Sequence, residues 1–138
     1  MNAFIKNADL QEEQFEWGTV RWRCRQANTG SAQLVVMETA LAPGQAHDFH
    51  RHPRQEELIT VMTGTVTQYL DRESAVLRPG DSVHVGMGTV HATFNTGAGP
   101  ALLVVTIGPA IGPDSYELVD VAGEEPWASI KRPAPQAS

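Results

Sequence analysis

Three histidines and at least one glutamate in this sequence have the types and spacing of metal ligands. His50 and His52 stand two residues apart in a stretch typical of a β-strand, and alternate residues of a strand point to the same face. Two imidazoles from one strand can therefore reach one ion. Glu57 follows after a turn, and His91 comes from a distant stretch. Three nitrogen donors and one carboxylate oxygen suit one divalent transition metal such as Fe, Mn, Ni, Cu or Zn.

The acidic ligand has two candidates, because Glu56 and Glu57 are adjacent and point to opposite faces of a strand. The next residues on the face of Glu57 are Ile59 and Val61, which suit a barrel interior, whereas the face of Glu56 is less uniformly apolar. This pattern favours Glu57 as the ligand. Glu56 is then an exposed carboxylate, or one that lies behind the ligands.

The elements that must position these residues are mostly strands. Between Val20 and Arg25, apolar residues alternate with arginines, which is typical of a strand with one buried face. Only residues 8–16, with Asp9 as a possible cap, suggest a helix. Gly, Pro, Asn and Asp separate the strand candidates at short intervals, which predicts an all-β sandwich or barrel. The candidates are residues 17–25, 32–41, 57–62, 65–70, 74–77, 81–85, 90–95 and 101–107.

Composition limits the class of protein. The chain has 138 residues, enough for one domain with a real core. Apolar runs are too short for a membrane helix, and the first residues lack a signal-peptide core. Cys24 is the only cysteine, which excludes an intrachain disulfide and favours a reducing, cytoplasmic setting. The net charge of −6 argues against nucleic acid as a partner.

Two motifs in the sequence together resemble those of the cupin superfamily. The first spans residues 44–64 and the second residues 80–95. Their glycines and ligand-type residues are Gly44, His50, His52, Glu57 and Gly64 in the first, and Gly80, His91 and Asn95 in the second. The resemblance implies an all-β cupin fold, a double-stranded β-helix or jelly-roll barrel, in a single domain over residues 1–130. It also implies His50, His52, Glu57 and His91 as the metal ligands.

The resemblance adds two details to the motifs. Counted back from Gly64, the family's register selects Glu57 over Glu56. Gly86 stands where the second motif usually has proline, which predicts a looser turn before His91. The polar, proline-containing tail, residues 131–138, lies outside the motifs and is predicted to be disordered.

The resemblance implies a metal-binding protein that acts on or binds a small organic molecule. Our leading hypothesis is a metal-dependent enzyme of dioxygenase type, with isomerase or lyase chemistry next. The alternative is a non-enzymatic module that binds or senses a small ligand, and fold alone does not decide between them. The sequence assigns no catalytic residue and no organic cofactor. Small cupins commonly pair, so the resemblance also implies a homodimer, for which Val20, Trp22, Trp17 and Trp127 offer surface.

Four further features have plainer interpretations. His47 is expected to be a solvated loop histidine, with a base behind the ligands as the alternative. His84 is expected to be a satisfied core or rim histidine, with an active role as the alternative. Asn95 is expected to fix a turn. The stripe of Arg21, Arg23 and Arg25 is expected to be the wet side of an edge or interface strand.

Overall fold

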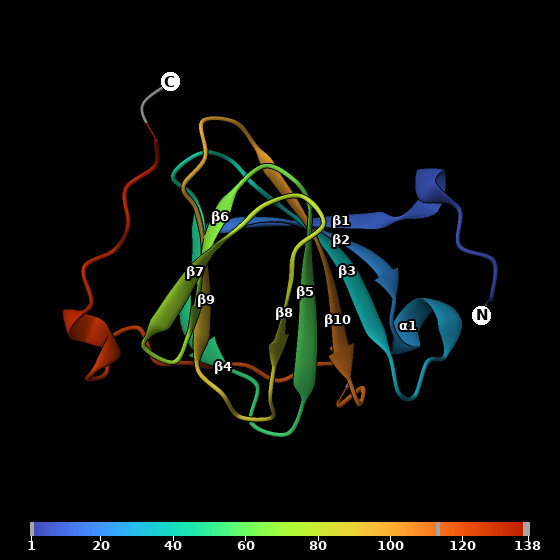
Figure 1. Cartoon of the computed structure of the whole chain (residues 1–138). Coiled ribbons are helices and arrows are strands. Elements are labelled where there is room, and N and C mark those ends of the chain that lie inside the picture. Colours follow the sequence, from blue (N-terminus) through green and yellow to red (C-terminus); the bar gives the residue numbers. More distant parts are fainter. Residues whose placement is uncertain (1, 113, 137–138) are drawn as a thin grey trace.

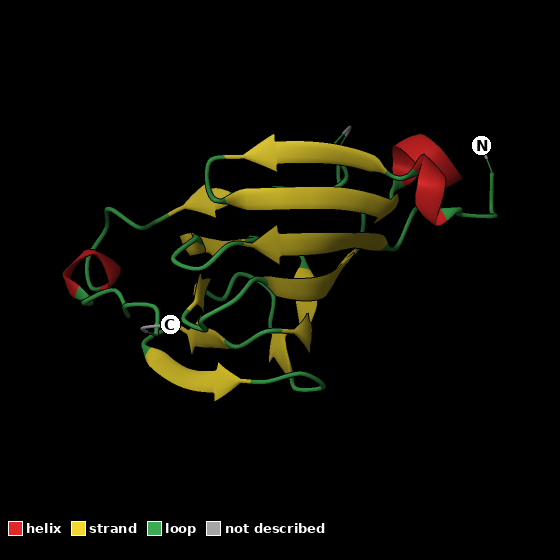
Figure 2. Ribbon diagram, turned by 90° about the horizontal axis from the view of Figure 1, so that it is seen from above, coloured by secondary structure: helices red, strands yellow, loops and turns green. Residues whose placement is uncertain are grey.

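The protein consists mainly of two antiparallel β-sheets (Figure 1). The structure is a computed structural model that describes residues 2–112 and 114–136. The six-stranded sheet has the order β1 (Gln11–Phe15), β2 (Gly18–Cys24), β3 (Val35–Leu41), β10 (Ala101–Gly108), β5 (Glu56–Thr63) and β8 (Ser82–Val85). The five-stranded sheet has the order β11 (Val119–Asp120), β4 (Ala46–Arg51), β9 (His91–Asn95), β6 (Val66–Leu70) and β7 (Glu73–Leu77). Helical structure in the described residues is limited to α1 (Gln26–Thr29) and two 3-10 turns, Asn7–Asp9 and Trp127–Ser129 (Figure 2). The predicted all-β jelly-roll architecture is confirmed.

The main core lies between the sheets, where alternate residues of each strand point inward. On β5, Glu57, Ile59 and Val61 are buried while Leu58 and Met62 are exposed. The turn that follows β5 needs a glycine, because Gly64 has a φ of +83° and a Cβ there would lie 2.6 Å from the carbonyl oxygen of Pro100. The motif glycine therefore serves turn geometry.

The prediction of a helix over residues 8–16 is wrong. A 3-10 turn at Asn7–Asp9 leads into β1, Gln11–Phe15, which pairs only with β2 at the edge of the six-stranded sheet. The first four residues of β1 are polar and exposed, so they show no period of two. An edge strand with little to bury carries no alternation signal.

The end of the chain is held against the five-stranded sheet, outside the barrel (Figure 1). The Arg132 guanidinium donates to the carbonyl oxygens of Trp127 and Ile130, both at 2.7 Å, and forms an ion pair with Asp48 at 3.1 Å. The backbone N–H of Gln136 donates to the carbonyl of Thr96 at 2.8 Å. The expectation of a disordered tail therefore does not hold for residues 131–136, and residues 137 and 138 lie outside the described part.

Val20 and Trp22 point into the core, with 1% and 4% of their surfaces exposed. The alternation predicted for this strand is therefore correct, but these two side chains do not offer surface to a second subunit. Within the part of the chain that the structure describes, no helix has the length and apolar character needed to cross a membrane.

Candidate metal centre

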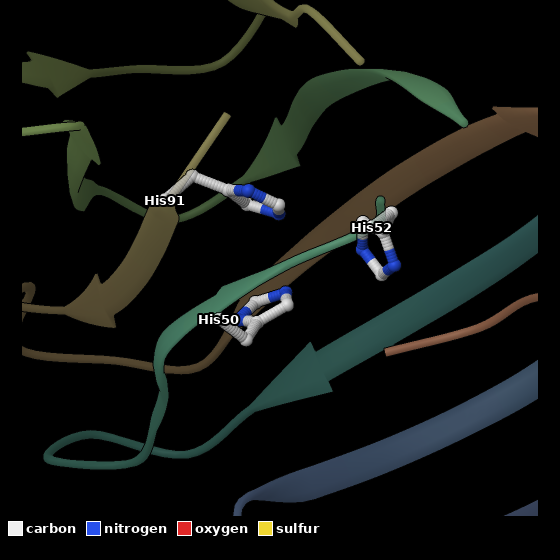
Figure 3. A group of neighbouring side chains, drawn as sticks. All are labelled: His50, His52 and His91. Carbon is white, nitrogen blue, oxygen red and sulfur yellow. The ribbon is translucent and has the colours of Figure 1, made fainter. Parts of the chain in front are cut away.

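The strands bring the three predicted histidine ligands together inside the barrel (Figure 3). His50 on β4 is the antiparallel partner of His91 on β9, and residues directly opposite in such a pair share one face of the sheet. His52 is the first residue after β4. All three side chains are buried, and one ring nitrogen of each lies within 4.8 Å of one ring nitrogen of each of the others.

Hydrogen bonds to backbone carbonyls set the orientation of each imidazole. The Nδ1 atoms of His50, His52 and His91 lie 2.7, 2.7 and 3.0 Å from the carbonyl oxygens of Asp48, Glu117 and Thr89, respectively. A carbonyl can only accept, so each Nδ1 carries the hydrogen, which leaves Nε2 as the donor atom of the neutral ring. This arrangement is typical of metal-ligating histidines.

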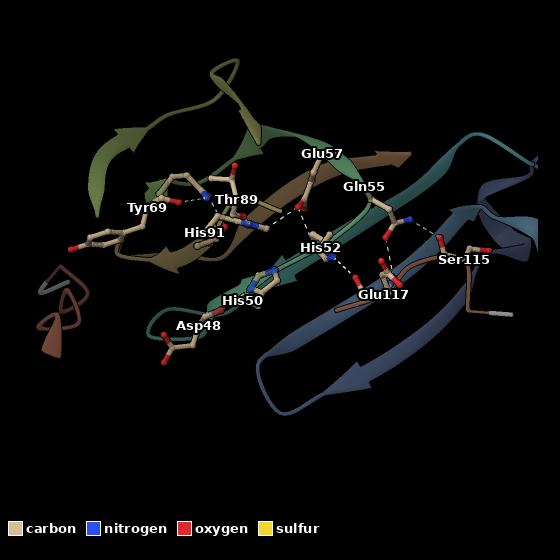
Figure 4. Close-up of polar contacts among 12 residues, drawn as sticks. Asp48, His50, His52, Gln55, Glu57, Tyr69, Thr89, His91, Ser115 and Glu117 are labelled. Atoms are coloured by element: carbon tan, nitrogen blue, oxygen red, sulfur yellow. Dashed lines mark hydrogen bonds and ion pairs between the residues drawn. The ribbon is translucent and has the colours of Figure 1, made fainter. Parts of the chain in front are cut away.

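Glu57 enters the same site from β5 (Figure 4). Its Oε2 lies 3.1 Å from Nε2 of His52 and 2.8 Å from Nε2 of His91. Glu56 points the other way: its side chain is 65% exposed and pairs with His84 at 2.8 Å. Of the two adjacent glutamates, Glu57 is therefore the one that the fold places against the histidines, in agreement with the register of the motif.

The charges at the site follow from burial and from this carboxylate. Burial lowers the pKa of His50 well below its usual value, because desolvation disfavours the charged ring. Burial alone would raise the pKa of Glu57, but the adjacent imidazoles of His52 and His91 hold that pKa well below its usual range. Burial opposes a charge on His52 too, yet the bond to Glu57 raises its pKa. The site therefore holds an ionised carboxylate and a neutral His50.

The donor set fits a divalent transition metal. Oε2 of Glu57 and Nε2 of His91 are fully buried and lack a hydrogen-bond partner of good geometry among the described residues. Buried polar atoms without partners are rare and indicate a missing partner such as an ion. Two donors about 2.1 Å from one ion and at a right angle lie about 3 Å apart, which agrees with the 3.1 and 2.8 Å separations of Glu57 Oε2 from the two Nε2 atoms.

Gln55 supports this centre, a role that no sequence pattern indicates. Its side chain is 1% exposed, and its amide nitrogen donates to the carbonyls of Pro109 at 2.6 Å and Ser115 at 3.1 Å. Its amide oxygen accepts the backbone N–H of Glu117 at 3.0 Å. The carbonyl of Glu117 in turn holds His52. Gln55 therefore fixes the chain segment that orients a ligand histidine, a link that only the tertiary structure reveals.

His47 lies at the site as well, and the expectation of a solvated loop histidine is wrong. It is part of β4 and half-buried, and its ring stacks on that of His50 with centroids 3.7 Å apart. Residues three apart point to opposite faces of a regular strand, but the register of β4 against β9 shifts between His47 and His50. Such a bulge re-aims side chains, so both histidines face the barrel interior.

A pocket lies over the donors and is lined mainly by apolar side chains. Among the lining residues are Trp17, Met37, Leu41, Ile59, Leu103 and Tyr116. The space left for water-sized molecules is about 40 Å³, which is room for about three waters. The apolar lining limits the access of water to the donors and provides a surface for an organic molecule.

The remaining predicted residues lie away from this centre. Asn95 fixes a turn as expected: it is buried, its Nδ2 donates to the carbonyls of Leu41 and Gly99, and its Oδ1 accepts the N–H of Gly97. His84 is mostly exposed on the outer side of the six-stranded sheet, so the expectation of a core or rim position is wrong.

The arginine stripe also lies outside the centre. Arg21 and Arg23 are on β2, which has β1 on one side and β3 on the other and is therefore not the edge strand that was expected, and Arg25 caps the start of α1. Arg21 and Arg23 both pair with Glu38 of β3. The guanidinium of Arg25 lies 4.2 Å from the ring centroid of Trp22. These contacts account for the stripe without a ligand.

Comparison with known proteins supports the resemblance. The family model of the cupin domain matches residues 37–107, which are 71 of the 138 residues of the chain. The protein YdbB of Bacillus subtilis (strain 168) is 42% identical over 48 residues, an alignment that covers 34% of this chain and 42% of that protein. The match thus spans less than half the length of that relative.

Solved structures share the fold at low sequence identity. KdgF from Halomonas sp. has a TM-score of 0.71 and 18% identity, over 83% of this chain and 98% of that chain. The polyketide cyclase RemF from Streptomyces resistomycificus has a TM-score of 0.71 and 20% identity, over 92% of this chain and 91% of that chain. An oxalate decarboxylase from Lactobacillus farciminis has a TM-score of 0.71 and 18% identity, over 83% of this chain and 34% of that chain.

Proposed function

The chain belongs to the cupin domain family, and from this premise we propose that it is a metal-dependent enzyme of dioxygenase type that acts on a small organic molecule. The proposed ligands are His50, His52, His91 and Glu57. The proposal is supported by the convergence of the three histidines, with Glu57 Oε2 against His52 and His91, in an apolar pocket. Two of these donor atoms, Glu57 Oε2 and His91 Nε2, are buried without a hydrogen-bond partner among the described residues.

The four donors suit a catalytic site better than a structural one. A structural site is closed by protein ligands, whereas a catalytic site keeps open positions. Three histidines and one carboxylate around a six-coordinate ion leave two positions for other molecules. Bound in this set, a divalent ion would supply Lewis acidity and, in the case of iron or manganese, the redox chemistry that oxygen use requires.

The residues of the chain have separate tasks in this proposal. The backbone carbonyls of Asp48, Glu117 and Thr89 hold the three rings in one tautomer, so that their Nε2 atoms need no rearrangement to bind. Glu57 contributes the only negative charge among the four donors and partly neutralises the ion. The apolar pocket excludes bulk water, which strengthens electrostatic interactions within it.

Anaerobic reconstitution tests the proposal directly. Protein loaded in turn with iron(II), manganese, nickel, copper and zinc should retain about one ion per chain, given its single set of ligands. Oxygen uptake is then measured against a panel of diols, thiols and diketones. Glu57→Gln keeps the shape but removes the anionic donor, so it should weaken metal retention and lower uptake. Glu56→Gln is the matched control and should do neither.

The outcomes separate the alternatives. Wild-type protein that stays metal-free after reconstitution contradicts the proposal as a whole. Protein that retains metal, binds panel compounds and consumes no oxygen is a binding module, or an enzyme of isomerase or lyase type that product analysis would detect.

The homodimer implied by the family resemblance is proposed to use the outer face of the six-stranded sheet. Leu58 and Met62 are exposed there at 45% and 50%, and closed two-fold pairing is the commonest way to bury such a face. Sedimentation should give a dimer at micromolar concentration, and Leu58→Lys should weaken it. A wild-type monomer under these conditions contradicts this assignment.

A further inference from the structure

The lining of the pocket restricts both the charge and the size of a bound molecule. We infer that it takes a small, mainly apolar molecule with at most one negative charge, and that Trp17 determines specificity by limiting the size of that molecule. This inference rests on the proposed function, because it concerns the substrate of the same site.

The restriction on charge follows from the charged groups that line the pocket. Glu57 is the only carboxylate in the lining, and no Lys or Arg belongs to the lining among the described residues. A divalent ion and the Glu57 carboxylate would together carry one positive charge, which one anionic oxygen of a ligand neutralises. A second negative charge would find no cationic Lys or Arg side chain in the lining, and burying an unpaired charge is strongly unfavourable.

The restriction on size comes from Trp17, which stands in the two-residue turn between β1 and β2. Its ring stacks on that of His47 with centroids 4.0 Å apart and planes 5° apart. Phe15 also stacks on Trp17, with centroids at 5.2 Å. Trp17 is half-buried and lines the pocket. Removal of this ring would therefore enlarge the pocket at its edge and leave all four donors in place.

Gly18 holds the turn close to the pocket. A Cβ at Gly18 would lie 2.8 Å from the carbonyl oxygen of Ala40 and 2.8 Å from Cδ2 of Leu41, closer than real Cβ atoms approach. The absence of a side chain lets the hairpin lie directly against β3. Trp17 is therefore held over the site by its stacking with Phe15 and His47 and by the close contact of the neighbouring Gly18 with β3.

The charge restriction is tested with two ligands of nearly the same shape. Pentane-2,4-dione and malonate differ in having methyl groups or anionic oxygens at their ends. Calorimetry on zinc-loaded protein should give at least about tenfold tighter binding of the diketone, after each affinity is divided by that ligand's affinity for free zinc ion. The same order is expected in metal-free protein, because the lining offers a dianion no Lys or Arg among the described residues. Equal or tighter binding of malonate in both forms overturns the inference.

The size restriction is tested with a larger diketone, 1,3-diphenylpropane-1,3-dione. Trp17→Ala should raise its affinity relative to pentane-2,4-dione by about tenfold, and Trp17→Leu should shift the ratio in the same direction if the alanine variant does not fold. Trp127→Ala removes a tryptophan outside the pocket and should leave the ratio unchanged. A ratio that does not move in either Trp17 variant overturns the assignment of Trp17.

Metal content is measured in parallel, so that a failure of the proposed function can be distinguished from a failure of the inference about the ligand. Protein that holds zinc and prefers malonate contradicts this inference alone. Protein that holds no zinc contradicts the proposed function, and the inference is then decided by the ligand order and the size ratio in the metal-free form.

Discussion

Strands β4 and β9 carry histidines on their inner face, which lines the barrel interior, and aromatic residues on their outer face. The outer face packs Phe49, Ala92 and Phe94 under the C-terminal segment, and all three are at most 5% exposed. Phe49 meets the rings of Tyr69 and Phe94 edge-on. The Arg132 guanidinium lies 4.8 Å from the centroid of the Phe49 ring. This face is a second hydrophobic core.

Burial of the inner face of the same strands lowers the stability of the folded protein. His50 loses the hydration of its charged form, and buried atoms of Glu57 and His91 lack hydrogen-bond partners. Such groups lower stability unless a ligand compensates for them. The outer face therefore stabilises the strands, and the inner face can hold polar donors in fixed positions. Stability and chemistry are thus assigned to opposite sides of one sheet.

The largest expected effect tests the outer face. Phe49→Ala removes a fully buried ring and should lower the free energy of unfolding by about 3 to 5 kcal/mol, measured by urea denaturation of metal-free protein. Phe49→Leu fills most of the space and should cost clearly less. The comparison predicts that folded Phe49→Leu retains its metal stoichiometry. Loss of metal in this variant, at unchanged secondary structure, would show that the two faces are not separable.

The inner face gives the converse result. His50→Leu removes a proposed donor and should lower metal affinity by more than about 100-fold, since even residues that only orient ligands contribute about 10- to 100-fold. The free energy of unfolding of the metal-free protein should change by less than about 1 kcal/mol, because a buried imidazole gives way to an apolar group of similar volume. Competition with a chromophoric chelator measures the first quantity and urea denaturation the second. A large loss of stability would contradict the idea that the inner face is retained for chemistry.

The difference between the faces also explains which parts of the site could be predicted from the sequence. His50, His52, Glu57 and His91 were identifiable because the histidine spacing matches a strand and the glycines place both motifs in register. Local spacing carries this information. The choice of Glu57 over Glu56 followed from the register of the motif counted back from Gly64, with which the apolar residues Ile59 and Val61 agree in part.

The unpredicted parts depend on contacts between segments distant in sequence or on irregular strands. His47 reaches the site through a bulge, which breaks the period of two on which strand predictions rest. Gln55 acts through residues 54 to 62 positions further along the chain. The C-terminal cover, with Trp127, Ile130 and Arg132, has no periodicity of its own because it packs as an irregular segment.

Acidification should weaken the metal-free protein through the inner face. Burial lowers the pKa of His47 to about 3 and that of His50 well below its usual value. Below about pH 6.5 the unfolded chain binds protons at both residues while the folded chain does not. The free energy of unfolding should therefore fall by about 1 kcal/mol per residue and pH unit.

His52 and Glu57 also contribute to the pH dependence of the free energy of unfolding. The pKa of His52 is raised, so its contribution is complete below its usual value of 6.5 and is lost as the pH rises through the folded value. Glu57 has a lowered pKa, so its contribution is present above its usual value of 4.5 and is lost in stronger acid. Stability should thus be greatest near pH 6.5, measured by urea denaturation in a chelator between about pH 5 and 8.

His47→Phe is the matched variant for the acid limb. It keeps an aromatic ring between Trp17 and His50 and removes one titrating group, so the slope below pH 6.5 should be about halved. An unchanged slope would mean that His47 takes up a proton in the folded protein, which contradicts its burial at the site.

The smallest expected effect concerns the turn that leads into the inner face, where Gly86 replaces the usual motif proline. Gly86 does not have a left-handed φ, and a Cβ there would meet only Oγ1 of Thr89, at 3.5 Å. Gly86→Ala should therefore raise the free energy of unfolding by about 0.4 to 1 kcal/mol, because it restricts the unfolded chain without strain in the folded one.

Gly88, two residues on, has a φ of +74°, and its N–H donates to the carbonyl of His52 at 2.9 Å. Gly88→Ala should lower stability by about 1 kcal/mol. If Gly86 loosens the turn before His91, Gly86→Ala should also raise the affinity for metal slightly. Equal metal affinity at higher stability would mean that the strand pairing of His91 alone fixes the position of this proposed ligand.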